Sequence, residues 1–280
     1  MVDLHAHTDR SDGALSPRQL VDLAVHNGLS ALAITDHDTL DGYEAAAPHA
    51  KQIGLDLICG VELSASFHGR PIHILGYFLG AAPGATFRRH LDCIQHSRRE
   101  RNRRLAAKLQ SLGLEVTAEE AEALGRGQTG RPHFALVLVE KGYAPTVREA
   151  FNTYLDERAP GFVARRDASA ENMLRWIEEA GGISSWAHPG RFLRDSGYGS
   201  VTSVGELASK GLKAVEVFHA DHDAGERQSL QAAADKARLA VTGGSDFHNP
   251  DTAKIPLGGL KLPDSLLERL RDRYALPIDG

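Results

Sequence analysis

Five apolar segments of the sequence each end in a short group of histidine or carboxylate residues, and this pattern restricts the fold more than any other feature. The groups are His-Ala-His at 5–7, Thr-Asp-His-Asp at 35–38, Gly-Val-Glu at 60–62, Ala-His-Pro at 187–189 and Gly-Gly-Ser-Asp-Phe-His at 243–248. Closed α/β barrels and open α/β sheets place their sites at the carboxyl ends of buried strands. We therefore expect these groups to meet at one edge of an α/β fold.

Apolar strands alternate with helical patterns in both halves of the sequence. We expect strands at 2–7, 29–35, 56–62, 71–78, 182–187, 214–218 and 240–243, and helices at 16–28, 41–53, 168–180 and 223–238. Alternation of this kind predicts a parallel sheet. Because a closed barrel brings many strand ends to one place more readily than an open sheet, we predict a distorted barrel.

The middle of the chain follows a different pattern. Helical segments at 98–112, 117–124, 132–141 and 146–156 succeed one another without a convincing strand between them. We therefore predict a catalytic barrel formed by 1–100 and 166–280, and a small helical insertion at 101–165 that covers the active site. A chain of 280 residues is long enough for this arrangement.

Composition excludes several classes of protein. The formal net charge of -5 argues against a generally cationic nucleic-acid binder. Cys59 and Cys93 are the two cysteines, so a disulfide framework is not expected. No apolar run reaches the roughly 20 residues that span a bilayer, and the N-terminus enters a strand without the features of a signal peptide. We expect a soluble cytoplasmic protein that needs no membrane and no obligate protein partner.

The ligand-type residues are more numerous than a single metal ion can use. They are His5, His7, Asp12, His37, Glu62, His73, His188, Asp246 and His248. Imidazole mixed with carboxylate, without thiolate, suits Mn²⁺, Fe²⁺ or Zn²⁺. Each residue taken alone has an ordinary explanation, such as a strand-end histidine, a turn aspartate at position 12 or a core histidine at position 73. Their joint occurrence in this order is what indicates a metal centre.

Local spacing indicates how some of these side chains are presented. Residues i and i+2 of a strand face the same side, so His5 and His7 can bind one ion or two neighbouring ions. We interpret His37 as a ligand supported by Asp36 or Asp38, although Asp38 or Thr39 could instead cap the following helix. Glu62 could bridge two cations. Pro189 is expected to hold His188 in an extended segment.

The ordered motifs His-x-His-Thr, Thr-Asp-His-Asp, Gly-Val-Glu, His-Pro and Gly-Ser-Asp-x-His resemble those of the PHP (polymerase and histidinol phosphatase) superfamily, from residue 1 to about residue 249. The resemblance implies a distorted (β/α)7 barrel with three divalent metal ions, Mn²⁺ first, with Zn²⁺ or Fe²⁺ as alternatives. It also implies one ion held by His5, His7, Glu62 and Asp246, a second by Glu62, His73 and His188, and a third by Asp12, His37 and His248. Every expected ligand position is filled, which argues against an inactive member.

The helical insertion resembles one branch of this superfamily more narrowly. Gly-Arg-Pro-His at 130–133 and Phe-Asn-Thr-Tyr-Leu at 151–155 are similar to the branch that acts on small nucleotides and RNA 5′ ends. This resemblance implies removal of the 3′-phosphate from nucleoside 3′,5′-bisphosphates. It also implies, in some members, stepwise release of 5′-nucleotides from short RNA. The expected partner is thus a small nucleotide with two phosphates, or a short RNA 5′ end.

Several basic residues could bind the substrate. Arg131 precedes a proline suited to the start of a helix, and a helix N-terminus attracts anions, so Arg131 and His133 are candidates for holding a second phosphate. The alternative is a plain helix start with an exposed arginine. Arg191, and Arg165 or Arg166, could contact the phosphate on the metals, or could form ordinary surface ion pairs.

The predicted mechanism is direct hydrolysis. A hydroxide that bridges metal ions would attack phosphorus in line, and His219 or His222, both expected at the barrel mouth, could protonate the leaving oxygen as a general acid. Either histidine could equally be polar lining. The basic stretch at 88–108 is either a solvated helix face or a track for an RNA backbone.

Two other functions stay open at this point. One is a histidinol-phosphatase-like or general phosphomonoesterase, which would need no second anion site. The other is non-enzymatic, a metal-binding accessory module like the PHP domains attached to polymerases. The sequence contains no polymerase segments, and its ligand set is intact, so we favour the enzyme.

Overall fold

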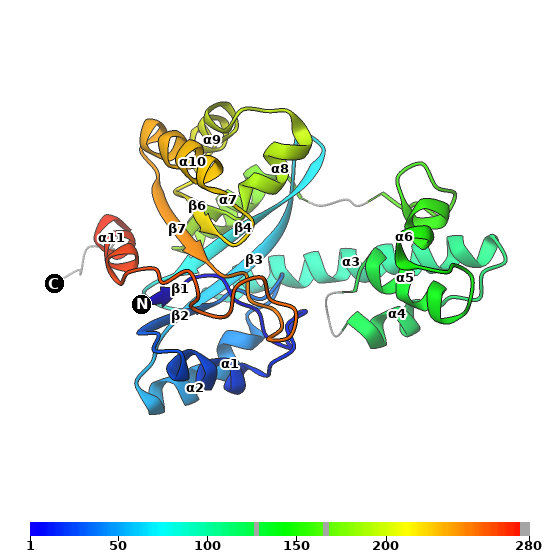
Figure 1. Cartoon of the computed structure of the whole chain (residues 1–280), viewed down its shortest axis with the longest axis horizontal. Helices are drawn as coiled ribbons and strands as arrows, with labels where there is room; N and C mark the ends of the chain where they lie inside the picture. Colours follow the sequence, from blue (N-terminus) through cyan, green and yellow to red (C-terminus); the bar gives the residue numbers. More distant parts are fainter. Residues whose placement is uncertain (126–128, 165–167, 275–280) are drawn as a thin grey trace. The chain divides into compact units, whose positions relative to one another are not determined.

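The computed structural model describes residues 1–125, 129–164 and 168–274. The chain divides into two compact units, one formed by Met1–Arg89 with Asp167–Gly280 and the other by His90–Arg166. The first unit contains a seven-stranded sheet that is nearly closed into a barrel, with helices packed around it (Figure 1). The predicted α/β barrel is therefore confirmed.

The strands follow one another around the sheet in sequence order. They are β1 (Val2–Asp3), β2 (Ala31–Ile34), β3 (Asp56–Phe67), β4 (Arg70–Phe78), β5 (Ile183–Trp186), β6 (Ala214–His219) and β7 (Ala240–Gly244). The backbone N–H of Leu4 donates to the carbonyl of Gly243 at 3.2 Å, so the segment after β1 meets the last strand. This contact nearly completes the barrel.

The prediction of a parallel sheet is wrong at β4, which runs antiparallel to both β3 and β5. Strands β3 and β4 are joined by His68 and Gly69, whose φ angles are 49° and 72°. Two-residue turns with positive φ at both positions connect antiparallel strands, whereas parallel strands need a crossover of a dozen or more residues. The hairpin also extends β3 beyond its expected end, so Glu62 lies in the middle of this strand.

Seven helices accompany the strands of the described part of the barrel unit. They are α1 (Pro17–His26), α2 (Asp41–Ile53), α7 (Ala170–Glu179), α8 (Pro189–Ser196), α9 (Ser200–Ser209), α10 (Ala224–Ala237) and α11 (Ser265–Tyr274). Helix α1 begins as the sequence predicts, because the Ser16 side chain accepts a hydrogen bond from the backbone of Gln19 and Pro17 occupies the first turn. Helices α8, α9 and α11 were not expected.

The extended segment expected at Pro189 is also wrong. Pro189 occupies the first turn of α8, where its fixed φ suits a helix. His188 precedes it in the left-handed region, with φ 31° and ψ 53°. The side chains of Glu216 and His222 hold this turn, since they accept the backbone N–H groups of His188 and Gly190.

The second unit is helical. It comprises most of α3 (Ala85–Ser111), followed by α4 (Ala118–Gly125), α5 (Arg131–Glu140), α6 (Val147–Ala150) and a π-helix η1 (Phe151–Leu155). Its own core is built from buried residues such as Leu105, Leu109, Phe134 and Leu138. Helix α3 begins before the expected residue 98, and the helix expected at 146–156 is split into α6 and η1. That this unit covers the active site stays a prediction.

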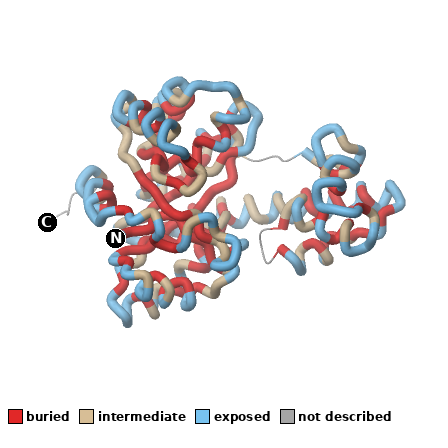
Figure 2. Tube along the Cα trace, viewed as in Figure 1, coloured by how far each residue is buried: buried red, intermediate tan, exposed pale blue. Residues whose placement is uncertain are grey.

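Burial is concentrated along the strands of the barrel unit (Figure 2). Leu4, Leu75 and Tyr77 belong to one apolar cluster of this core, and Leu20, Leu32 and Ile34 belong to another. Buried polar residues occur beside these apolar clusters and include most of the ligand-type residues. Among the described residues, none of the helices combines the length and apolar character needed to cross a membrane.

Candidate metal centre

The carboxylate of Glu62 is the meeting point of the candidate site. It is fully buried on β3, where its side chain is surrounded by imidazoles. One oxygen, Oε2, lies 3.2 Å from Nε2 of His5, 3.1 Å from Nε2 of His7 and 3.3 Å from Nδ1 of His37. The other, Oε1, lies 2.8 Å from Nδ1 of His73 and 2.9 Å from Nε2 of His188. A single carboxylate thus contacts five ligand-type residues, which come from four separate segments of the chain.

Asp246 is a second carboxylate that contacts the first two histidines. Its Oδ1 is 3.3 Å from Nε2 of both His5 and His7. The residue has a positive φ of 55°, and its backbone N–H donates to the carbonyl of His5 at 2.9 Å. This turn after β7 points the carboxylate toward the imidazoles that follow β1.

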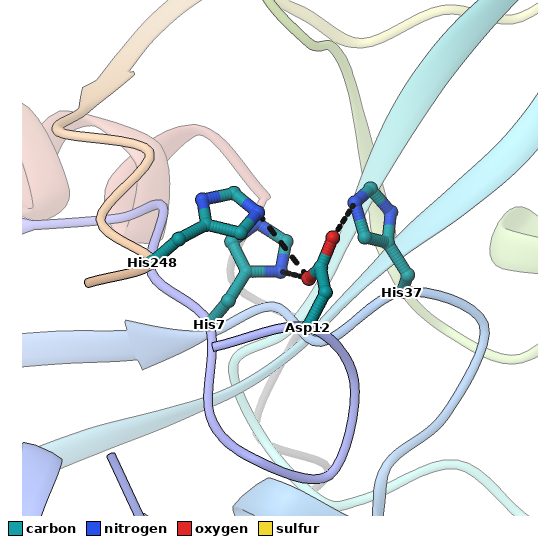
Figure 3. A group of neighbouring side chains, drawn as sticks. All are labelled: His7, Asp12, His37 and His248. Atoms are coloured by element: carbon teal, nitrogen blue, oxygen red, sulfur yellow. Dashed lines mark ion pairs between the residues drawn. The ribbon is translucent and has the colours of Figure 1, made fainter. Parts of the chain in front are cut away.

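Asp12 gathers a second group of imidazoles, shown in Figure 3. Its carboxylate lies 3.3 Å from Nε2 of His248, 3.6 Å from Nε2 of His37 and 3.7 Å from Nδ1 of His7. The loop that carries Asp12 is held by Asp36, whose carboxylate accepts hydrogen bonds from Ser11 Oγ and from the backbone and hydroxyl of Thr8. The tight loop therefore folds Asp12 back toward the histidine pair, as its sequence position indicates.

Asp36 and Asp38 were expected to support His37. Their carboxylates organise the backbone around the site. Asp36 fixes the loop of Asp12, and Asp38 accepts hydrogen bonds from the backbone and hydroxyl of Ser64 at 2.8 and 3.0 Å. The N-cap position of α2 is Leu40, which makes no side-chain cap bond, but the hydroxyl of Thr39 accepts the backbone N–H of Asp41 in the first turn at 3.2 Å.

These side chains fit divalent metal ions. Within the described residues, donor atoms closer than 4.8 Å to one another form the groups His5–His7–Glu62–Asp246, His7–Asp12–His37–His248, His37–Glu62–His73 and His5–Glu216–His219. The first group contains the four residues expected for one ion, and the second contains the three expected for another together with His7. His188 approaches the shared Glu62 from α8. Nitrogen and carboxylate oxygen donors without thiolate are the ligands of Mn²⁺, Fe²⁺ and Zn²⁺.

The electrostatics of the site also suit metal ligands. Burial alone raises the pKa of the Glu62 carboxyl, but the surrounding imidazoles, His37 first among them, hold this pKa well below its ordinary value. Burial lowers the pKa of His37 to about 3 and that of His188 to about 4. At His5 and His7 the effect of burial is outweighed by the neighbouring carboxylates, which raise the pKa, that of His7 to about 10. Ionised carboxylates and neutral imidazoles are the forms that bind metal ions, so binding at this site would release protons from His5 and His7.

Two further buried carboxylates, which we did not predict, contact the residues of this cluster. Glu216 on β6 is fully buried, and its Oε1 lies 2.9 Å from Nδ1 of His5. Asp3 on β1 accepts backbone hydrogen bonds from His5, Ser245 and Gly258. Both residues lie inside apolar strand patterns, where an isolated carboxylate is the one sequence feature that could have revealed them.

The candidate ligands open into a cavity of about 420 Å³. Its lining includes Arg191, His219, Asp221 and Lys254 besides seven of the predicted ligand residues. Arg191 contacts Asp246 at 3.0 Å and Asp221 at 2.6 Å, while 46% of its side chain stays exposed. A cationic group therefore lies beside the metal ligands, in a position to contact an anion.

The structure separates the two candidates for the general acid. His222 is buried, its Nε2 accepts the backbone N–H of Gly190, and its Nδ1 lies 2.9 Å from the Val217 carbonyl. Both ring nitrogens are thus occupied by backbone groups, which makes His222 a poor proton donor to substrate. His219 lines the cavity, with Nε2 3.3 Å from Asp246 Oδ2 and Nδ1 accepting the backbone N–H of Asp221.

The remaining predicted substrate residues belong to the helical unit or fall outside the described chain. Arg131 begins α5, donates to the Leu155 carbonyl at 3.3 Å and lies over the ring of Phe162 at 5.5 Å. His133 accepts the backbone N–H of Gly130 through Nδ1. Arg165 and Arg166 lie outside the described residues.

Gly244 permits the close approach of β7 to the segment that carries His5. A Cβ atom at position 244 would lie 2.4 Å from the Cβ and backbone N of His5. We expect Gly244→Ala to displace His5, to weaken metal binding and to lower the free energy of unfolding by about 1–3 kcal/mol. Calorimetric unfolding and metal titration would measure both effects.

Gly205 in α9 provides the matched control, because a Cβ there meets nothing within 4 Å. Gly205→Ala should leave metal binding unchanged and stabilise the fold by about 0.4–1 kcal/mol. Equal metal affinity and stability in Gly244→Ala and the wild type would show that neither metal binding nor folding requires the close approach of residue 244 to His5.

The α/β barrel gathers buried histidine and carboxylate side chains beside a cavity that Arg191 lines. This arrangement defines a protein with a candidate polynuclear metal centre. Residues 3–160 match the model of the PHP domain. The chain belongs to the PHP domain family, and it is a phosphoesterase of that family.

Two curated relatives and one solved structure illustrate the match. The chain is 34% identical over 252 residues to the 3′,5′-nucleoside bisphosphate phosphatase of Chromobacterium violaceum, covering 89% of this chain and 87% of that protein. It is 35% identical over 267 residues to the 5′-3′ exoribonuclease of Haemophilus influenzae, covering 95% and 96%. A candidate metal-dependent phosphoesterase from Bifidobacterium adolescentis superposes with a TM-score of 0.80 at 28% identity, covering 100% of this chain and 98% of that one.

Proposed function

We propose that this protein removes the 3′-phosphate from nucleoside 3′,5′-bisphosphates to give 5′-nucleotides, and that it also trims short RNA from the 5′ end. The observation that carries this proposal is the convergence of the histidine and carboxylate residues on one cavity that Arg191 also lines. The names of the two curated relatives support the choice of substrate.

The metal assignments belong to this proposal. One ion is assigned to His5, His7, Glu62 and Asp246, a second to Glu62, His73 and His188, and a third to Asp12, His37 and His248. When bound, the divalent ions, Mn²⁺ first, polarise the phosphoryl oxygens and activate water for attack. The barrel contributes fixed ligand geometry and the burial that excludes competing water from Glu62.

Two cavity residues are assigned to the substrate. Arg191 keeps nearly half of its side chain exposed beside Asp246, so its guanidinium can donate hydrogen bonds to a phosphoryl oxygen. His219 accepts a backbone N–H at Nδ1, which leaves the proton on Nε2. That N–H faces Asp246 at the cavity, and we assign His219 the role of hydrogen-bond donor to the leaving oxygen, since a neutral imidazole that lost this proton would become an anion.

The second phosphate is assigned to Arg131 and His133. Gly130 is the N-cap of α5, Pro132 has no N–H, and the N–H of His133 donates to the Gly130 carbonyl at 3.0 Å. The positive end of the helix would therefore attract the anion mainly through its dipole. The guanidinium of Arg131 adds a positive charge at this helix N-terminus. Arg165 is the further predicted contact to substrate.

The first experiment compares phosphate release by Mn²⁺-loaded protein from adenosine 3′,5′-bisphosphate, AMP and histidinol phosphate at matched concentrations. The bisphosphate should be strongly preferred, and AMP should accumulate. Equal or faster turnover of a monophosphate would instead establish a general phosphomonoesterase or a histidinol-phosphatase-like enzyme. Metal-loaded protein that is inert toward every phosphoester would favour the accessory module.

Arg131→Ala tests the second anion site. We expect kcat/KM for the bisphosphate to fall roughly 10- to 100-fold, since a hydrogen bond to a charged group contributes about 1.5–3 kcal/mol, whereas hydrolysis of a simple monoester should hardly change. Arg103→Ala, at a position 62% exposed on α3, serves as the control for loss of a positive charge in the same unit. An equal loss on both substrates in Arg131→Ala would contradict the assignment.

A further inference from the structure

Glu216 is a buried carboxylate that belongs to none of the three proposed sets of metal ligands. It lies on β6 and is completely inaccessible to solvent. Oε1 lies 2.9 Å from Nδ1 of His5, and Oε2 accepts the backbone N–H of His188 at 2.7 Å. A single side chain therefore contacts two candidate ligands that lie far apart in the sequence.

The contact with His5 orients its imidazole. Oε2 of Glu216 accepts the N–H of His188, and Oε1 lies 2.9 Å from Nδ1 of His5, so Nδ1 is the nitrogen that donates to this carboxylate. Nε2 is then directed at the other candidate ligands, since it lies 3.2 Å from Glu62 and 3.3 Å from Asp246. A metal ion at this site would therefore meet His5 through Nε2.

The contact with His188 fixes a backbone conformation that is uncommon for residues other than glycine. His188 has a φ of 31°, which for a residue with a side chain needs support from its surroundings. Its N–H is held by Glu216, and the N–H of Gly190 two residues later is held by His222. This turn directs Nε2 of His188 to within 2.9 Å of Glu62.

We propose that Glu216 is a positioning residue of the metal centre, which holds His5 in the tautomer that binds metal through Nε2 and locks the turn that presents His188. This inference rests on the proposed metal site. The group His5–Glu216–His219 could in principle hold an ion of its own. However, its His5 and Glu216 atoms are already engaged with each other at hydrogen-bond distance, so we assign it to support and not to coordination.

Glu216→Gln is the most informative substitution because it preserves shape and removes one acceptor. The amide has one oxygen and one NH2 group, whereas the two neighbours both donate. With the oxygen on the N–H of His188, the NH2 group would face Nδ1 of His5, which can accept only if the proton moves to Nε2. The expected variant is folded but has the wrong His5 tautomer, so the affinity for Mn²⁺ should fall about 10- to 100-fold.

The experiment uses the full chain and three measurements. Calorimetric titration with Mn²⁺ gives affinity and stoichiometry, and thermal unfolding of the metal-free protein reports the fold. The ¹⁵N chemical shifts of the histidine rings, recorded on Zn²⁺-loaded protein, report the tautomer of His5. Ser185→Ala is the control. It removes a buried hydrogen bond between Ser185 on β5 and Thr242 on β7, the strands on either side of β6, and neither residue is a candidate ligand.

We expect weaker Mn²⁺ binding, a shift of the His5 proton to Nε2 and a similar unfolding temperature in Glu216→Gln, with unchanged affinity in Ser185→Ala. Unchanged Mn²⁺ affinity in Glu216→Gln would overturn this inference while leaving the proposed function intact. Loss of one complete ion with the His5 tautomer unchanged would also overturn it, because Glu216 would then be a ligand. Wild-type protein that binds no divalent ion would overturn both, whereas wild-type protein that binds Mn²⁺ but hydrolyses no phosphoester would overturn only the function.

Discussion

Glu62→Gln is expected to abolish phosphoesterase activity almost completely and to empty the metal centre. The carboxylate of Glu62 is the only group in the described structure whose two oxygens together face His5, His7, His37, His73 and His188. An amide is neutral and directs an NH2 group toward some of these imidazoles. Loss of a supporting contact outside the ligands costs about 10- to 100-fold, so loss of a bridging ligand should exceed 100-fold.

Phosphate release and the metal content of the purified protein measure this effect together. Glu268→Gln, an exposed position on α11, provides the control for the same chemical change away from the site. The proposal requires activity and metal content to fall together in Glu62→Gln. A variant that keeps its full complement of metal would show that Glu62 is not a ligand.

Asp3→Ala is expected to cause the largest loss of stability. The Asp3 side chain is buried, and its oxygens accept the backbone N–H groups of His5 at 3.3 Å, Ser245 at 2.9 Å and Gly258 at 2.9 Å. Alanine would leave three buried donors unsatisfied, each costing about 1–3 kcal/mol. Partial offset comes from relief of the buried carboxylate, whose pKa is raised mainly by burial. We expect a net loss of about 3–5 kcal/mol and a drop in Tm of roughly 10 °C.

Thermal unfolding of Asp3→Ala and Asp3→Asn would separate the contributions. Asparagine keeps one accepting oxygen, so its loss should be intermediate between alanine and the wild type. Asp272→Ala, at an exposed position of α11, should leave Tm nearly unchanged. If Asp3→Ala and Asp272→Ala unfold at the same temperature, the three backbone bonds to Asp3 do not hold the barrel closed.

The barrel could be predicted from the sequence because its strands and ligands occur in a regular order. Helix α2 has the bounds that its pattern predicts, and α1 begins at the predicted Ser16–Pro17 signal. The direction of β4 could not be predicted, because strand periodicity is the same in parallel and antiparallel pairs. The turn at His68–Gly69 carried that information, but His-Gly is not one of the dipeptides that usually mark a two-residue hairpin turn.

The candidate ligands could be named from the sequence, but the residues that hold them could not. Imidazoles and carboxylates at strand ends form a recognisable motif, and the structure gathers all nine named positions around Glu62, Asp12 and Asp246. Glu216 and Asp3 are single carboxylates inside apolar strands, and their roles depend on partners more than 200 residues away. Only the folded barrel brings those partners together.

The bonds from Asp3 to Ser245 and Gly258 span 242 and 255 positions of the chain, which bears on how the protein is made. The two histidines that follow β1 leave the ribosome more than 230 residues before Asp246 and His248. Closing a loop of this length carries an entropic cost that only late contacts can repay. The nascent chain therefore cannot complete the proposed first ion site until Asp246 has been translated, and truncation before Asp246 would leave His5 and His7 without that partner.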